Sequence, residues 1–129
     1  MQTIAIQYQH YFLINNLTVM TIEFHTPFGK VSEKLLNSIR KEVMELSHIN
    51  KKISRAEVML KEELDVTRGE NKICEIRLSI YGETLYTRTR TENFDKSAKD
   101  ALKELKRLVR QQVKKQTETP GQVTKTAKV

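Results

Sequence analysis

The apolar residues of this chain repeat with two different periods, and the order of these periods limits the folds available to it. Over residues 33–46 and 94–113 they recur every three to four positions, which predicts two amphipathic helices. Before the first helix and between the two, they alternate with polar residues, which predicts strands with one apolar face. The sequence therefore predicts an α+β fold of order β-α-β-β-β-α.

Each predicted strand has inward positions that are apolar or small. We expect a four-stranded sheet with both helices packed on its apolar face, in the manner of double-stranded-RNA-binding domains. Gly82-Glu83 is predicted as a two-residue hairpin turn with glycine first, and residues 63–71 as a polar loop. The predicted inward positions are Met20, Ile22 and Phe24; Ala56, Val58 and Leu60; Cys74, Ile76, Leu78 and Ile80; and Leu85, Thr87 and Thr89.

A chain of 129 residues is long enough for one domain, which we place at residues 20–115. Residues 1–19 carry no Lys, Arg, Asp or Glu, and Met20 opens the first predicted strand. We therefore expect residues 1–19 to be an N-terminal extension that lies upstream of the true start. Residues 116–129 are rich in Thr, Gln and Lys and contain Pro120-Gly121, which favours a disordered tail.

The composition excludes several classes of protein. A single cysteine rules out an internal disulfide framework and any multi-cysteine metal site. No apolar run approaches the roughly 20 residues that a membrane helix needs, so we expect a cytoplasmic protein with no membrane partner.

Nearly all the excess positive charge lies in one segment. Residues 96–115 hold eight basic and two acidic residues, a net charge of +6, whereas residues 20–95 hold 13 of each sign. On the second helix the basic residues lie opposite the apolar stripe, a pattern typical of a polyanion binder, although a solvated helix face is the alternative. Two arginines of the last strand are placed on the open face of the sheet. The predicted polyanion-binding residues are Lys96, Lys99, Lys103, Lys106, Arg107, Arg110 and Lys114 on the helix, with Arg88 and Arg90 on the strand.

No group of residues indicates catalysis. His10, His25 and His48 lack metal-ligand spacing, and Cys74 takes an inward strand position where a thiol is unreactive. Only four glycines are present, with no phosphate-binding loop. We therefore expect no enzymatic activity, no cofactor and no metal.

Several segments together resemble the bacterial ribosome hibernation promoting factor and ribosome-associated inhibitor family, also called sigma-54 modulation proteins. The resemblance runs from Met20 to about Lys115 and depends on the order and spacing of its pieces. These are Ile53-Ser-Arg-Ala-Glu-Val58, similar to the family's I-T-D-A-E-V; Asn71-Lys-Ile-Cys-Glu-Ile-Arg-Leu78; Tyr81-Gly-Glu-Thr-Leu85; Glu92-Asn-Phe94; and Leu105-Lys-Arg-Leu108, similar to L-x-R-Q-L.

The resemblance implies a short-form protein that binds small-subunit rRNA near the decoding centre. It implies occupation of the mRNA and tRNA channel, inhibition of translation in stationary phase or stress, and a part in pairing idle ribosomes. Arg107 matches the family motif directly, whereas the other helix cations follow as members of the same face. We expect the free protein to be a monomer.

One departure from the family pattern concerns the first helix. The family commonly carries K-L-x-K-L there, but this chain has Glu42 and Glu45 at the lysine positions, so we place the rRNA contacts on the second helix. Two other functions stay open: a general double-stranded-RNA or tRNA-binding module of similar fold, and a protein-interaction module that modulates transcription.

Overall fold

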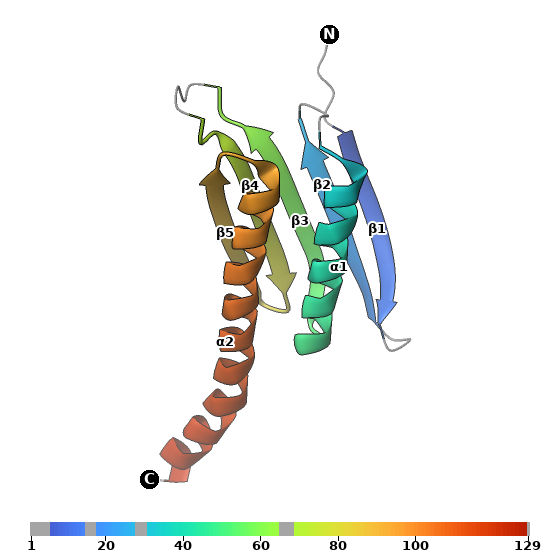
Figure 1. Ribbon diagram of the computed structural model, residues 1–129. Coiled ribbons are helices and arrows are strands. Elements are labelled where there is room, and N and C mark those ends of the chain that lie inside the picture. Colours follow the sequence, from blue (N-terminus) through green and yellow to red (C-terminus); the bar gives the residue numbers. More distant parts are fainter. Residues whose placement is uncertain (1–5, 15–17, 28–30, 65–68, 129) are drawn as a thin grey trace.

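The computed structural model describes residues 6–14, 18–27, 31–64 and 69–128. Two helices lie side by side over one mixed sheet (Figure 1). Along the chain the elements are β1 (Ile6–Ile14), β2 (Thr18–Thr26), α1 (Glu33–Ile49), β3 (Ile53–Glu62), β4 (Lys72–Ile80), β5 (Glu83–Thr91) and α2 (Phe94–Lys128).

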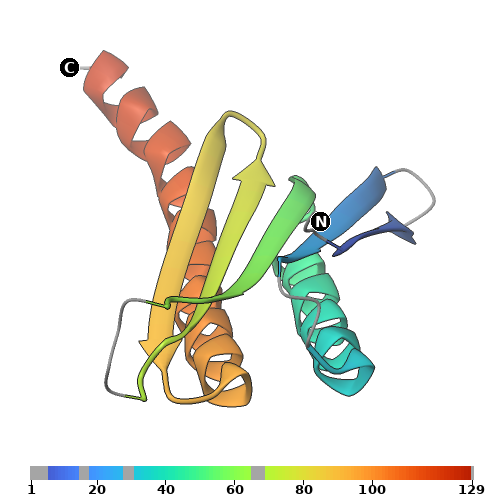
Figure 2. The ribbon, with the colours of Figure 1, turned by 90° about the horizontal axis from the view of Figure 1, so that it is seen from above.

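The five strands form a single sheet in the order β1-β2-β3-β4-β5. β2 and β3 are parallel because the chain crosses over through α1 between them, and every other neighbouring pair is antiparallel. Figure 2 shows both helices on the same side of the sheet. The predicted β-α-β-β-β-α order is therefore confirmed from β2 onward.

The structure adds one strand to the four that were predicted. β1 pairs with β2 from Ile6↔Thr26 to Ile14↔Thr18 and forms an edge of the sheet. The lack of charge in residues 1–19 gave no sign of this strand, because strands pair through backbone groups and need no charged side chain. The translation start at Met20 stays a prediction.

One core fills the space between the sheet and the helices. The predicted inward positions of β2, β3 and β4 are all buried. Those of β2 are Met20, Ile22 and Phe24. The apolar stripes of both helices meet them. The helix members of the core are Leu35, Leu36, Ile39, Val43 and Leu46 from α1, and Ala98, Ala101, Leu105 and Val109 from α2.

Polar caps determine where the helices start and stop. Ser32 is the N-cap of α1, and its hydroxyl accepts a hydrogen bond from the Leu35 N–H at 3.1 Å. Asn50 ends α1 in an extended conformation, one turn beyond the predicted 33–46 range. At the start of α2, Asn93 Oδ1 accepts from the Lys96 N–H at 2.7 Å.

α2 continues beyond the predicted range of 94–113 to Lys128, over residues for which a disordered tail was predicted. In Figure 1 its C-terminal part extends past the end of the sheet. The composition of this segment limits how much apolar surface it can bury. It does not prevent a helix, because a helix is held by hydrogen bonds within its own backbone.

The β4–β5 hairpin turn differs from its prediction by one residue. Ile80 pairs with Glu83, so the two loop residues are Tyr81 and Gly82, with glycine second rather than first. Gly82 has φ +79°, a region that residues with a Cβ rarely adopt. The register of the two strands, and not glycine position alone, determines which pair of residues makes the turn.

Among the residues that the structure describes, no helix is both long and apolar enough to span a membrane.

Candidate nucleic-acid interface

The basic strip of α2 comprises the seven predicted helix cations. They occupy the side of the helix turned away from the core, and all seven residues are exposed. At about 100° per residue they span an arc of about 100°, opposite Ala98, Ala101 and Leu105. The strip consists of Lys96, Lys99, Lys103, Lys106, Arg107, Arg110 and Lys114.

Arg107 of the basic strip is paired with a carboxylate. Its Nε and Nη2 donate to the two Glu104 oxygens at 3.1 and 2.7 Å. This pairing lowers the pKa of Glu104 and raises the pKa of Arg107. Among the side chains that the structure describes, none forms an ion pair with any of the other six cations. Six positive charges are thus available to a polyanion, while the charge of Arg107 is offset by Glu104.

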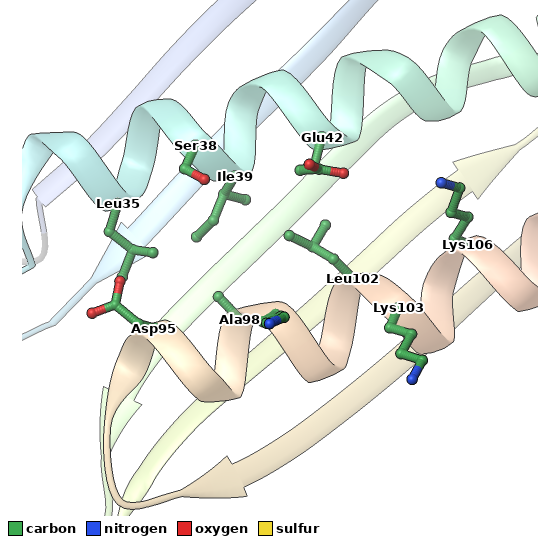
Figure 3. Close-up of a pocket in the computed structure, with 10 residues that line it drawn as sticks. Leu35, Ser38, Ile39, Glu42, Asp95, Ala98, Leu102, Lys103 and Lys106 are labelled. Atoms are coloured by element: carbon green, nitrogen blue, oxygen red, sulfur yellow. The ribbon is translucent and has the colours of Figure 1, made fainter.

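A groove of about 510 Å³ runs between the two helices beside the basic strip. Figure 3 shows Leu102 on α2 pointing into it, with Glu42 on the α1 wall and Lys106 on the α2 wall. Glu45 lies further along the same side, where it lines a smaller cavity with Lys106. Glu42 therefore faces the groove and Glu45 faces the neighbouring cavity, so the α1 side repels phosphate while the lysines of the α2 wall attract it.

Arg88 and Arg90 do not join the basic strip. They alternate on β5 with Thr87 and Thr89, whose hydroxyls donate to α2 carbonyls, so the two arginines lie on the opposite, open face of the sheet. Each is matched by a carboxylate: Arg88 Nε lies 3.1 Å from Glu75, and Arg90 Nη1 lies 3.0 Å from Glu63.

The rest of the open face is also balanced in charge. Arg55 bridges Glu23 at 2.6 Å and Glu57 at 2.8 Å, and Arg77 lies 3.8 Å from Glu57. Cross-strand pairs of opposite charge stabilise a sheet and leave little net field for a polyanion. The tertiary structure therefore separates the nine predicted residues into an unbalanced group on α2 and a neutralised pair on β5.

One group of side chains on the open face has the spacing of metal ligands. Ligand atoms of Glu23, His25 and Glu57 lie within 4.8 Å of one another. The Arg55 guanidinium already contacts both carboxylates, so a cation would have to displace it. This arrangement fits an ion-pair cluster better than a metal centre.

Cys74 lies inside the sheet, as predicted from its alternation. It is fully buried, and burial together with the nearby Glu75 charge raises the pKa of its thiol to about 12. A thiol that stays protonated is a poor nucleophile.

Two features of this site escaped the sequence analysis. The Glu104–Arg107 pair has an i,i+3 spacing, which is a recognisable signal for an ion pair on a helix. The groove has no such signal, because α1 and α2 supply its walls from segments some 60 residues apart, and only their packing brings Glu42 opposite Lys106.

Comparison with solved structures supports the fold. A ribosomal subunit interface protein from Coxiella burnetii aligns with a TM-score of 0.58 at 14% identity, over 68% of this chain and 91% of that chain. The N-terminal domain of Protein Y from Thermus thermophilus aligns with a TM-score of 0.55 at 14% identity, over 70% of this chain and 91% of that chain.

Comparison with curated protein sequences finds no significant match. Comparison with protein families gives a match over residues 22–117, which is most of the chain and runs from within β2 to just beyond the basic strip. The matched region is the β-α-β-β-β-α unit predicted from hydrophobic periodicity. The chain therefore belongs to the sigma 54 modulation protein / S30EA ribosomal protein family.

Proposed function

We propose that this protein binds the small ribosomal subunit through the basic strip of α2. In doing so it occupies the mRNA and tRNA channel near the decoding centre, and inhibits translation in stationary phase or stress. The family is one of ribosome-binding proteins without enzymatic activity, so ribosome association follows from membership. The observation that carries the finer proposal is the row of exposed α2 cations, six of which form no ion pair with a carboxylate among the described residues.

The geometry of the basic strip suits a run of phosphates. From Lys96 to Lys114 it extends about 27 Å along the helix, at about 1.5 Å per residue. Lysine ammonium groups neutralise single phosphates, and Arg110 is able to donate two parallel hydrogen bonds. Contacts of this kind position a protein on RNA without reading its sequence.

Occupation of the channel accounts for inhibition without chemistry. A rigid domain that rests on rRNA phosphates in the channel excludes mRNA and tRNA by its volume, so it needs no catalytic residue and no cofactor. Such a protein acts in the cytoplasm, where the ribosomes are. A part in pairing idle ribosomes belongs to the same proposal.

The first experiment is co-sedimentation of the full chain with small subunits, large subunits and duplex RNA at physiological salt. We expect saturable one-to-one binding to small subunits alone. If about five phosphates are neutralised, log Kd against log salt should have a slope of roughly 3 to 5 in magnitude. Equal binding to all three targets would instead indicate a general double-stranded-RNA-binding module.

Two charge-reversal variants identify the surface that binds. In Lys103→Glu/Arg110→Glu the change lies within the basic strip, and in Lys34→Glu/Lys41→Glu the same change lies on the exposed side of α1. We expect the first to abolish binding and the second to keep most of it, with both proteins folded by circular dichroism. Equal loss in both would mean that net charge, and not the strip, governs binding.

Occupation of the channel is tested by competition. Increasing mRNA with initiator tRNA should release the protein from small subunits, and the protein should inhibit translation of a reporter mRNA in a purified system. Binding that persists unchanged in saturating mRNA and tRNA would place the site elsewhere on the subunit.

A further inference from the structure

The two edges of the sheet differ in how they are protected against pairing. β5, at one edge, carries Glu83, Arg88 and Arg90, and charged side chains are a usual defence of an exposed edge. β1, at the other edge, reads Ile-Gln-Tyr-Gln-His-Tyr-Phe-Leu-Ile and contains no Lys, Arg, Asp, Glu, Pro or Gly.

The outer edge of β1 is open along its whole length. Its nine residues pair with β2 without a register shift, and no described element lies beyond β1 in either Figure 1 or Figure 2. The N–H and C=O groups that alternate toward this edge therefore have no strand partner among the described residues. A long, regular and uncharged edge of this kind is a template for another strand.

We propose that the β1 edge binds a second copy of this chain, with the two β1 strands antiparallel and centred on His10. The result is one continuous sheet shared by two protomers. This dimer differs from the monomer expected from the sequence, and it requires β1 to be part of the native protein, in place of the start at Met20 expected from the sequence. It is independent of the function proposed for the basic strip.

The sequence of β1 favours a copy of itself over other partners. An antiparallel pairing centred on His10 sets Ile6 opposite Ile14, and Tyr8 opposite Phe12, of the second copy. Aliphatic and aromatic cross-strand pairs each stabilise a sheet. Since β1 has no Lys, Arg, Asp or Glu, the two copies meet without like-charge repulsion at the contact while His10 is neutral.

The arrangement of the fold also limits this assembly to two copies. Pairing β1 with β1 uses the same edge of both protomers and leaves only the charged β5 edges exposed, so the assembly closes rather than growing into fibres. α2 packs on β4 and β5, at the far side of the sheet from β1. The two basic strips therefore stay well apart, which weakens the repulsion between two protomers of net charge +7.

The contact is small, so the dimer should depend on concentration. Nine residues at about 3.4 Å each give a shared edge of about 30 Å, which places the interface at the low end of the size range. Sedimentation velocity of the full chain from about 1 to 200 μM should show a shift from the 15.1 kDa monomer toward twice that mass.

A charge variant tests the edge directly. Gln9→Lys/Tyr11→Lys places lysines opposite each other across the proposed contact, whereas His48→Lys/Gln111→Lys adds the same charge at exposed helix positions. We expect the first variant to stay monomeric and the second to dimerise like the unchanged chain. A monomeric unchanged chain, or equal dimerisation of both variants, would overturn the proposal.

Disulfide cross-linking tests the register of the two β1 strands. It does so with a variant that should keep the dimer intact. In the proposed pairing the two His10 Cα atoms lie about 5 Å apart, within disulfide range, whereas the two Gln7 Cα atoms are about 20 Å apart. With diamide as oxidant, His10→Cys should give a covalent dimer and Gln7→Cys should not. Equal cross-linking of both, or none at position 10, would contradict this arrangement.

Discussion

Asn50 and Gln112 are 62 residues apart in the chain and hydrogen-bonded in the interior, with Asn50 Nδ2 donating to Gln112 Oε1 at 3.1 Å. Gln112 Nε2 in turn donates to Glu83 Oε1 at 2.9 Å. Asn50 ends α1, Gln112 lies on α2 and Glu83 begins β5. This chain of polar contacts therefore ties the end of one helix to the other helix and to the β4–β5 hairpin.

Breaking this contact should destabilise the fold. Gln112→Met keeps a side chain of similar size but leaves the buried Asn50 amide without its acceptor, at a cost of about 1–3 kcal/mol. Urea denaturation measures the free energy of unfolding. The matched variant Gln111→Met, at the exposed neighbouring position, should change it by less than about 0.5 kcal/mol. Equal stability of the two variants would show that the contact contributes nothing.

Freeing Arg107 should strengthen binding to small subunits. Glu104→Gln removes the carboxylate that holds Arg107, and Asp100→Asn makes the same change of charge on α2 without releasing a cation. We expect the salt slope of binding to steepen by about 1 in the first variant and by less in the second. The same slope in both variants would mean that Arg107 does not reach a phosphate.

The Glu104–Arg107 pair should also respond to pH in a defined direction. Because Arg107 lowers the pKa of Glu104, the pair persists below the pH at which an ordinary glutamate is protonated, and it is lost only when the pH falls through that lowered pKa. NMR titration of the Glu104 carboxyl should give a midpoint below the ordinary 4.5, and the Arg107→Gln variant should restore it. An unchanged midpoint in the variant would exclude the pairing in solution.

Arg88 and Arg90 should contribute less to binding than the basic strip. Each already contacts a carboxylate on the open face, so a phosphate gains little from displacing that partner. We expect Arg88→Gln/Arg90→Gln to weaken co-sedimentation less than Lys103→Gln/Arg110→Gln, which removes the same number of charges. A larger loss in the β5 variant would assign the rRNA contact to the open face of the sheet.

The Cys74 thiol should be unreactive until the protein unfolds. Its pKa of about 12 keeps it protonated at pH 8, and it is fully buried. Ellman's reagent should therefore react only after urea is added, whereas a Gln111→Cys variant should react in the native state. Because the unfolded thiol ionises near 9.0, the free energy of unfolding should fall as the pH rises from about 9 to 12. Replacing Cys74 by alanine should reduce that fall.

Hydrophobic periodicity was sufficient to predict most of the fold. Apolar residues spaced three to four positions apart lie on one side of a helix. This spacing accounts for the burial of Ile39 and Val43 on α1, and of Leu105 and Val109 on α2. The errors in the predicted fold concern features that hydrophobic periodicity does not report. β1 pairs through its backbone, and the hairpin turn falls at Tyr81 and Gly82 because strand register places it there.

By itself, the sequence determined the order of helices and strands from β2 onward, the apolar face of each, and the unbalanced charge of α2. These properties depend on residues that are close together in the sequence, so they can be predicted without knowing which helices and strands pack against each other. Only the tertiary structure decided that Arg88 meets Glu75, that Glu42 faces Lys106 across a groove, and that β1 forms an uncharged edge. Those relationships depend on which strands and helices become neighbours and in what register, and no local pattern encodes that choice.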